Sequence, residues 1–226
     1  IMEPPFRVLG LGYPKSAECS VGSVYVGEFK RGHFPESCPP SSHITLRFDR
    51  PGKDDLEFHW MDGGIQPTRP EELGPNETMG DGGNGVIIEG TKGKMMCSTY
   101  GANPLLLPTS KTKDIKVQES LYRVPGGDRG HYDNWVNACI AGYGSTEFKQ
   151  LSSPFSIAGP LTESVLMGNL AIRSYDYQAP KGLLSNQVEY PGRGIKLLWD
   201  GPNMKITNFD PANQFVTRTY RSGYTL

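Results

Sequence analysis

The 226-residue sequence has no excess of basic residues and no long hydrophobic run. Its 23 lysines and arginines are balanced by 24 acidic residues, for a formal net charge of −1. Because a strongly basic surface is typical of nucleic-acid-binding proteins, we expect no nucleic-acid partner. No apolar segment approaches the roughly 18 residues of a membrane-spanning helix, so we expect no membrane partner either.

Cysteine is also scarce. The four cysteines, Cys19, Cys38, Cys97 and Cys139, are far apart and form no C-x-x-C pair. The acidic residues and histidines show no metal-ligand spacing either, so we expect no metal site. The flanking patterns predict that Cys19, Cys97 and Cys139 are buried thiols and that Cys38, in a proline- and serine-containing loop, is exposed. No G-x-S-x-G motif or Cys/His arrangement is present, so we assign no catalytic residue to this chain.

The stretch FRVLGLGYPKSA (6–17) lacks one glycine of a dinucleotide-binding turn. Gly10 and Gly12 fit the G-x-G-x-x-G pattern, but Lys15 stands where the third glycine is needed and Pro14 precedes it. These two glycines are more simply explained as the end of a short helix that leads into a strand. We therefore expect no cofactor-binding residue in this chain and no binding of NAD(P) by the chain alone.

Turn-forming and aromatic residues, by contrast, are plentiful. The 28 glycines and 19 prolines indicate many turns, and 10% aromatic residues argue against disorder. Alternating or β-branched patterns predict strands at 16–29, 43–50, 56–64, 115–124, 195–201 and 204–209, and a hairpin at 85–101. Helices are predicted at 129–141, with Trp135 in the core, from about Thr162, and from Pro211. Strands that cluster ahead of helices indicate an α+β domain with helices packed on one face of a sheet, and no second-domain boundary is evident.

Two short stretches carry the candidate binding residues. His59, Trp60 and Asp62 come at a strand end, where a tryptophan can stack on a sugar and a carboxylate can accept from its hydroxyls. His131 and Tyr132 lie at the start of the predicted helix, whose N–H groups favour hydroxyls or anions. We expect His59, Asp62 and His131 to converge on one pocket wall. The structural alternative is that Asp62 merely begins a turn and His131 is an ordinary polar residue.

Several longer segments together resemble the C-terminal part of Gfo/Idh/MocA-family oxidoreductases, in a branch similar to that of Bacteroidetes bacteria. The resemblance covers nearly the whole chain, in order and spacing. It is carried by HWMDGGIQPTRPEEL (59–73), GVIIEGTKGKMMCSTYG (85–101), GDRGHYDNWVNACIAG (127–142), GPLTESVLMGNLAIRS (159–174), KLLWDG (196–201), MKITN (204–208) and PANQFVTRTYRSGY (211–224).

The resemblance implies a substrate-binding and oligomerisation domain, residues 1–226, of a bacterial NAD(P)-dependent sugar or polyol oxidoreductase. It implies a large, open, mixed but mostly antiparallel sheet, one face of which lines the substrate pocket. The Rossmann domain that binds NAD or NADP would precede Ile1 in a longer protein, so we expect the chain alone to be inactive. The resemblance does not distinguish between a cytoplasmic and a periplasmic location.

Two alternatives remain open at this stage. The chain is compatible with a stand-alone carbohydrate-binding or scaffold domain without catalysis, and less well with part of an NAD-using glycoside hydrolase. We also expect a homo-oligomer that forms through one sheet face. HITLRF (43–48) and GVIIEG (85–90) supply more apolar side chains than a few helices should cover.

Overall fold

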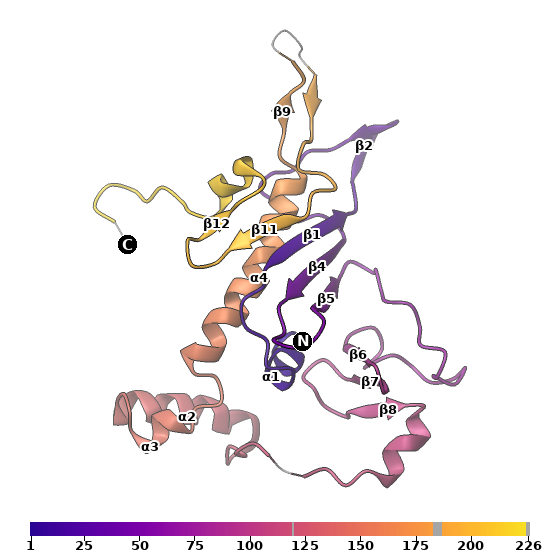
Figure 1. Ribbon diagram of the computed structural model, residues 1–226, viewed down its shortest axis with the longest axis vertical. Helices are drawn as coiled ribbons and strands as arrows, with labels where there is room; N and C mark the ends of the chain where they lie inside the picture. The colour runs from indigo at the N-terminus through magenta and orange to yellow at the C-terminus, as the bar shows by residue number, and fades with distance from the viewer. Residues whose placement is uncertain (119, 183–186, 225–226) are drawn as a thin grey trace. The chain divides into compact units, whose positions relative to one another are not determined.

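The computed structural model describes residues 1–118, 120–182 and 187–224, and it confirms the α+β class (Figure 1). The chain divides into two compact units. Unit 1 comprises residues 1–10 and 69–161, and unit 2 comprises residues 11–68 and 162–226. Each unit is described by itself below. The expectation that all 226 residues form a single domain stays a prediction. None of the helices in the described ranges is long and apolar enough to cross a membrane.

Unit 2 is built on a five-stranded sheet. Every pairing described within this sheet is antiparallel. Its strands, in spatial order, are β12 (Lys205–Ile206), β11 (Leu197–Asp200), β1 (Ser16–Val21), β4 (Ser42–Phe48) and β5 (Leu56–Met61).

One face of this sheet is apolar and is covered by the helix α4 (Phe155–Tyr175), which crosses behind β1 and β4 in Figure 1. On β4, Ile44, Leu46 and Phe48 are 7%, 3% and 1% exposed, as strict alternation requires of a half-covered strand. Gly168 permits the close approach, because a Cβ there would lie 3.0 Å from Ile44 Cδ1. The apolar side chains of HITLRF are therefore buried under a helix rather than left for a partner.

The helix α4 begins earlier than its sequence predicts. A start near Thr162 was expected because Pro160 precedes it, but the helix runs from Phe155 with Pro160 inside. A proline within a helix costs one backbone hydrogen bond. The helix nevertheless continues through Pro160, and Phe155 at its start is 86% exposed.

The predicted strand 16–29 is also divided. It consists of β1 and β2 (Tyr25–Gly27), and β2 pairs with β3 (Lys30–Arg31) in a separate hairpin. Unit 2 further contains the pair β9 (Ala179–Pro180) and β10 (Val188–Glu189). The terminal helix predicted from Pro211 is the 3₁₀ helix η2 (Asp210–Phe215), which starts beside Pro211 as predicted but ends before Thr219 and Tyr220, which were expected on its apolar face.

Unit 1 contains a three-stranded sheet and several helices. The predicted hairpin at 85–101 is confirmed as β6 (Val86–Gly90) and β7 (Gly93–Cys97), and Leu73, Met96 and Leu107 form a buried cluster there. The helix predicted at 129–141 is confirmed as α2, which begins two residues earlier. The other elements are α1 (Glu3–Val8), β8 (Leu105–Leu107), η1 (Thr109–Asp114) and α3 (Thr146–Lys149).

The glycines of FRVLGLGYPKSA end a helix, as the simpler explanation requires. The N–H of Gly10 donates to the carbonyl of Arg7 at 3.2 Å, and Gly10 has φ +63°, so it closes α1 in the left-handed region. The chain then reaches β1 at Ser16.

Three other expectations are wrong. The described residues of 115–124 form no strand. Trp135 is 61% exposed instead of buried in a core. Cys139 is exposed as well, although helical spacing suggested a buried face. Cys19 and Cys97 are half-buried, and burial raises the pKa of both thiols, that of Cys19 to about 12. Cys38 is exposed, as predicted.

Candidate functional site

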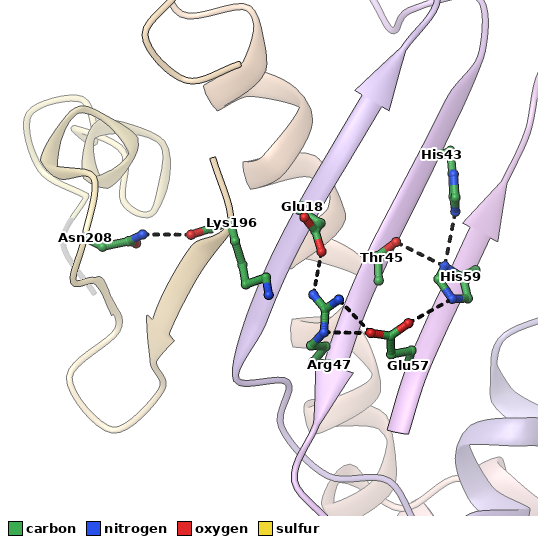
Figure 2. A network of polar contacts seen from close by, with 8 residues as sticks. All are labelled: Glu18, His43, Thr45, Arg47, Glu57, His59, Lys196 and Asn208. Atoms are coloured by element: carbon green, nitrogen blue, oxygen red, sulfur yellow. Dashed lines mark hydrogen bonds and ion pairs between the residues drawn. The ribbon is translucent and has the colours of Figure 1, made fainter. Parts of the chain in front are cut away.

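The face of the unit 2 sheet opposite α4 carries polar side chains from three neighbouring strands. Strand register places Thr45 between Glu18 and His59, and Arg47 opposite Glu57. Figure 2 shows that these side chains point toward one another across the sheet. We call this set the polar face; it consists of Glu18 on β1, His43, Thr45 and Arg47 on β4, and Glu57 and His59 on β5.

Arg47 joins the three strands through two carboxylates. Its Nη1 lies 2.5 Å from Glu18 Oε1, and its Nε and Nη2 lie 2.9 and 2.6 Å from Glu57 Oε1. Hydrogen bonds to Glu18 and Glu57 raise the pKa of the Arg47 guanidinium. Because Arg47 is flanked on both sides, its charge-assisted hydrogen bonds hold the two carboxylates in fixed positions on the sheet.

The two histidines share a polar contact beside this ion-pair network. His59 Nδ1 lies 3.1 Å from Thr45 Oγ1 and 3.2 Å from His43 Nε2, while His59 Nε2 lies 3.5 Å from Glu57 Oε2. Partial burial lowers the pKa of His43, and the neighbouring His59 lowers it further. His43 therefore favours its neutral form, in which one ring nitrogen donates and the other accepts.

This arrangement suits a ligand rich in hydroxyl groups. Such a ligand needs acceptors for its hydroxyl hydrogens and donors for its oxygens, and the polar face supplies carboxylates, imidazoles and a guanidinium within a few residues. The carboxylate-bearing side chains stay accessible, with Glu18 38% and Glu57 47% exposed. No group of three or more potential metal ligands occurs in the part of the chain that the structure describes.

The structure separates His59 from Trp60 and Asp62. Alternation along β5 puts His59 on the polar face and Trp60 on the opposite face. Trp60 Nε1 donates to Asp62 Oδ2 at 2.9 Å, so Asp62 lies with Trp60. The expectation that His59 and Asp62 converge on one pocket wall is therefore wrong, because one residue of register along a strand reverses the direction of a side chain.

Asp62 holds the ends of two strands together. Besides Trp60, the backbone N–H of Ser42 donates to Asp62 Oδ1 at 2.6 Å, and the Ser42 hydroxyl donates to Asp62 Oδ2 at 2.8 Å. Three donors of the protein thus occupy a carboxylate that has about four acceptor positions. The structure gives Asp62 a structural role, and its contact with a substrate stays a prediction.

His131 and Tyr132 lie in unit 1, at the start of α2. His131 Nδ1 is 3.3 Å from Ser152 Oγ, and the Tyr132 side chain is 75% exposed. The convergence of His131 with residues of unit 2 stays a prediction, as does a role of either residue in substrate binding.

Sequence reasoning missed most of the polar face. It singled out strand ends, whereas Arg47, Glu57 and Glu18 lie within strands. The signal was available in the alternation of HITLRF (43–48) and LEFHWM (56–61), whose polar positions fall on one face when the two strands pair.

The comparisons with known proteins add no identification. No protein-family model matches the chain, and no curated protein matches it.

Proposed function

We propose that this chain is the substrate-binding part of an NAD(P)-dependent sugar or polyol oxidoreductase and that the polar face binds the substrate. The observation that carries the proposal is the network of Glu18, Arg47, Glu57 and His59 on the open side of the sheet. The sequence resemblance to Gfo/Idh/MocA proteins supports the same substrate class.

The chemistry of such an enzyme divides between cofactor and protein. NAD or NADP, held by a Rossmann domain, accepts a hydride from a carbinol carbon, while protein groups position the substrate and take up the hydroxyl proton. Among the polar-face residues, Glu18, Glu57 and His59 carry accessible hydrogen-bond acceptors for a substrate hydroxyl. The proposed role of this chain is to bind and orient the substrate, and we expect the chain alone to be inactive.

The open face of the unit 2 sheet bears on the expected self-association of the chain. A homo-oligomer through one sheet face was expected because HITLRF and GVIIEG supply apolar side chains. GVIIEG lies in the separate sheet of unit 1, whereas α4 buries the apolar side chains of β4, and the open side of that sheet carries the polar face beside the exposed Leu198. That physical reason for self-association is therefore absent from this sheet. We assign the open face to substrate binding, and self-association stays a separate prediction.

A stand-alone carbohydrate-binding domain is the second candidate. The short helix that ends at Gly10 is compatible with both candidates, and the carboxylates and imidazoles of the polar face can bind hydroxyl groups without a cofactor. This candidate uses the same polar face but requires no hydride acceptor.

The test uses the product of the complete reading frame that encodes this chain. It is assayed for reduction of NAD⁺ or NADP⁺ with a panel of sugars and polyols, beside variants Glu57→Gln and, as a matched control, the exposed Glu28→Gln. We expect activity that Glu57→Gln lowers at least tenfold in kcat/KM, about 1.4 kcal/mol, and that Glu28→Gln leaves unchanged. Sugar binding without nicotinamide reduction would favour the second candidate, and neither binding nor reduction would overturn both.

A further inference from the structure

A cleft of about 190 Å³ lies in unit 2, and none of the polar-face residues lines it. It is formed by the segment after β3, the C-terminal end of α4 with the residues that follow, and η2. Its wall includes the aromatic rings of Phe34, Tyr177 and Phe215 and the polar side chains of Arg173, Asp176 and Gln178. We propose that this cleft binds a small organic acid, whose carboxylate pairs with Arg173.

Arg173 provides the charge that such a ligand needs. Its guanidinium lies over the Phe215 ring, 4.5 Å from the centroid. Among the described residues no carboxylate pairs with it. Asp176, the acidic residue of the cleft, is paired with Arg193 at 3.6 Å, and Arg193 in turn lies over the Tyr190 ring. The negative charge in the cleft is thus neutralised, whereas the positive charge of Arg173 is not.

A guanidinium that rests on an aromatic ring is well arranged to receive a carboxylate. Stacking fixes the plane of the fork and leaves its N–H groups at the edge, where a carboxylate forms two parallel hydrogen bonds. Lysine cannot reproduce this geometry, because an ammonium group is a point charge on a flexible stem.

The other residues of the cleft favour a ligand with a carbon skeleton over a bare inorganic ion. Phe34 is 52% exposed and supplies apolar surface beside Tyr177. Gln178 Nε2 donates to the Tyr190 hydroxyl at 3.0 Å, which leaves the Gln178 carbonyl oxygen as an acceptor. The volume is below the roughly 300 Å³ of the smallest drug-sized pockets, so the ligand is a small molecule of one ring or a short chain.

A purely structural explanation of Arg173 makes a different prediction. A cation in the last turn of a helix is stabilised by the helix dipole without any ligand. In that case Lys would serve as well as Arg, and removal of the charge would change stability but no binding reaction.

The experiment is a titration of the isotope-labelled 226-residue chain, followed by NMR. The probes are benzoate and gluconate, with benzyl alcohol and sorbitol as their neutral counterparts and inorganic phosphate as the bare anion. We expect both carboxylates to shift amide signals around Arg173 and Tyr177 and the neutral counterparts to leave them unshifted. Arg173→Gln should weaken carboxylate binding at least tenfold, Arg173→Lys should weaken it less, and Lys53→Gln, on an exposed loop of unit 2, should leave it unchanged.

Three results would overturn the proposal: no shift with either carboxylate, equal binding by Arg173→Gln, or phosphate that binds as tightly as the carboxylates. A folded spectrum of each variant shows that lost binding is not lost structure. The proposal does not rest on the function of the polar face, because none of the polar-face residues lines the cleft and the amide signals around Arg173 report on the cleft.

Discussion

Asp62 and His43 illustrate how single polar residues stabilise this sheet. Asp62 accepts hydrogen bonds from Ser42 and Trp60 and so fastens β4 to the end of β5. His43 lies on the polar face beside His59, and partial burial lowers its pKa. Replacement of Asp62 should therefore change the unfolding free energy, and replacement of His43 should change its pH dependence.

Replacement of Asp62 by Ala should destabilise the protein. The change leaves the N–H and hydroxyl of Ser42 and the indole N–H of Trp60 without their acceptor, which should cost about 2 to 3 kcal/mol of unfolding free energy. Urea denaturation measures the change. Asp54→Ala, on the exposed loop before β5, is the control and should lie within about 0.5 kcal/mol of the parent. Equal stability of both variants would contradict the structural role of Asp62.

Stability should fall as the pH is lowered through the range in which His43 titrates. The folded-state pKa of His43 is below its ordinary value of 6.5, so the unfolded chain binds more protons in that interval. The unfolding free energy therefore decreases as the pH falls from 6.5 to the folded-state pKa of His43. Below that pKa, His43 causes no further decrease. His43→Gln should reduce the stability difference between about pH 8 and pH 5.5. His33→Gln, at an exposed histidine, is the control. If His43→Gln changed the stability difference between the two pH values no more than this control, the prediction would be wrong.

The elements show which parts of the fold the sequence could predict. Alternation in β4 and the turn between β6 and β7 are local signals, and both were predicted correctly. The start of α4 was not, because Pro160 is a local stop signal that the helix nevertheless passes. The polar face was also missed, since Arg47 and Glu57 come together only when the strand register is known.

The two faces of the sheet should respond differently to truncation. Leu46 is 3% exposed beneath α4, and Leu46→Ala should cost about 2 to 5 kcal/mol of stability through lost burial and a cavity. Leu198, on β11, is 44% exposed and lies in register with Ser16 on the opposite face. Leu198→Ala should cost less than about 1 kcal/mol. Comparable losses in thermal or urea unfolding would contradict the assignment of the two faces.

At the scale of the whole molecule, two compact units share one long helix. Of the three places where the chain passes between unit 1 and unit 2, the one at Leu161–Thr162 lies within α4. A helix that is part of both units links their unfolding, because helix formation is cooperative and unfolding of one end destabilises the other. We therefore expect the units to behave as one cooperative system.

Differential scanning calorimetry tests this expectation. A single transition, with equal calorimetric and van't Hoff enthalpies, is the predicted result for the 226-residue chain. Gly168→Trp places a bulky side chain against Ile44 and should shift that single transition as a whole. Two resolved transitions, of which the variant moves only one, would show that the units fold independently.

Binding of a sugar or polyol to the polar face most directly tests the proposed substrate site. Amide signals of the labelled chain are followed by NMR during titration with a panel of hexoses, pentoses and polyols. We predict that at least one of them shifts the signals of Thr45, Arg47, Glu57 and His59 together and that Glu57→Gln weakens this binding at least tenfold. Shifts confined to other regions, or none at millimolar ligand, would contradict the assignment of the polar face as the substrate site.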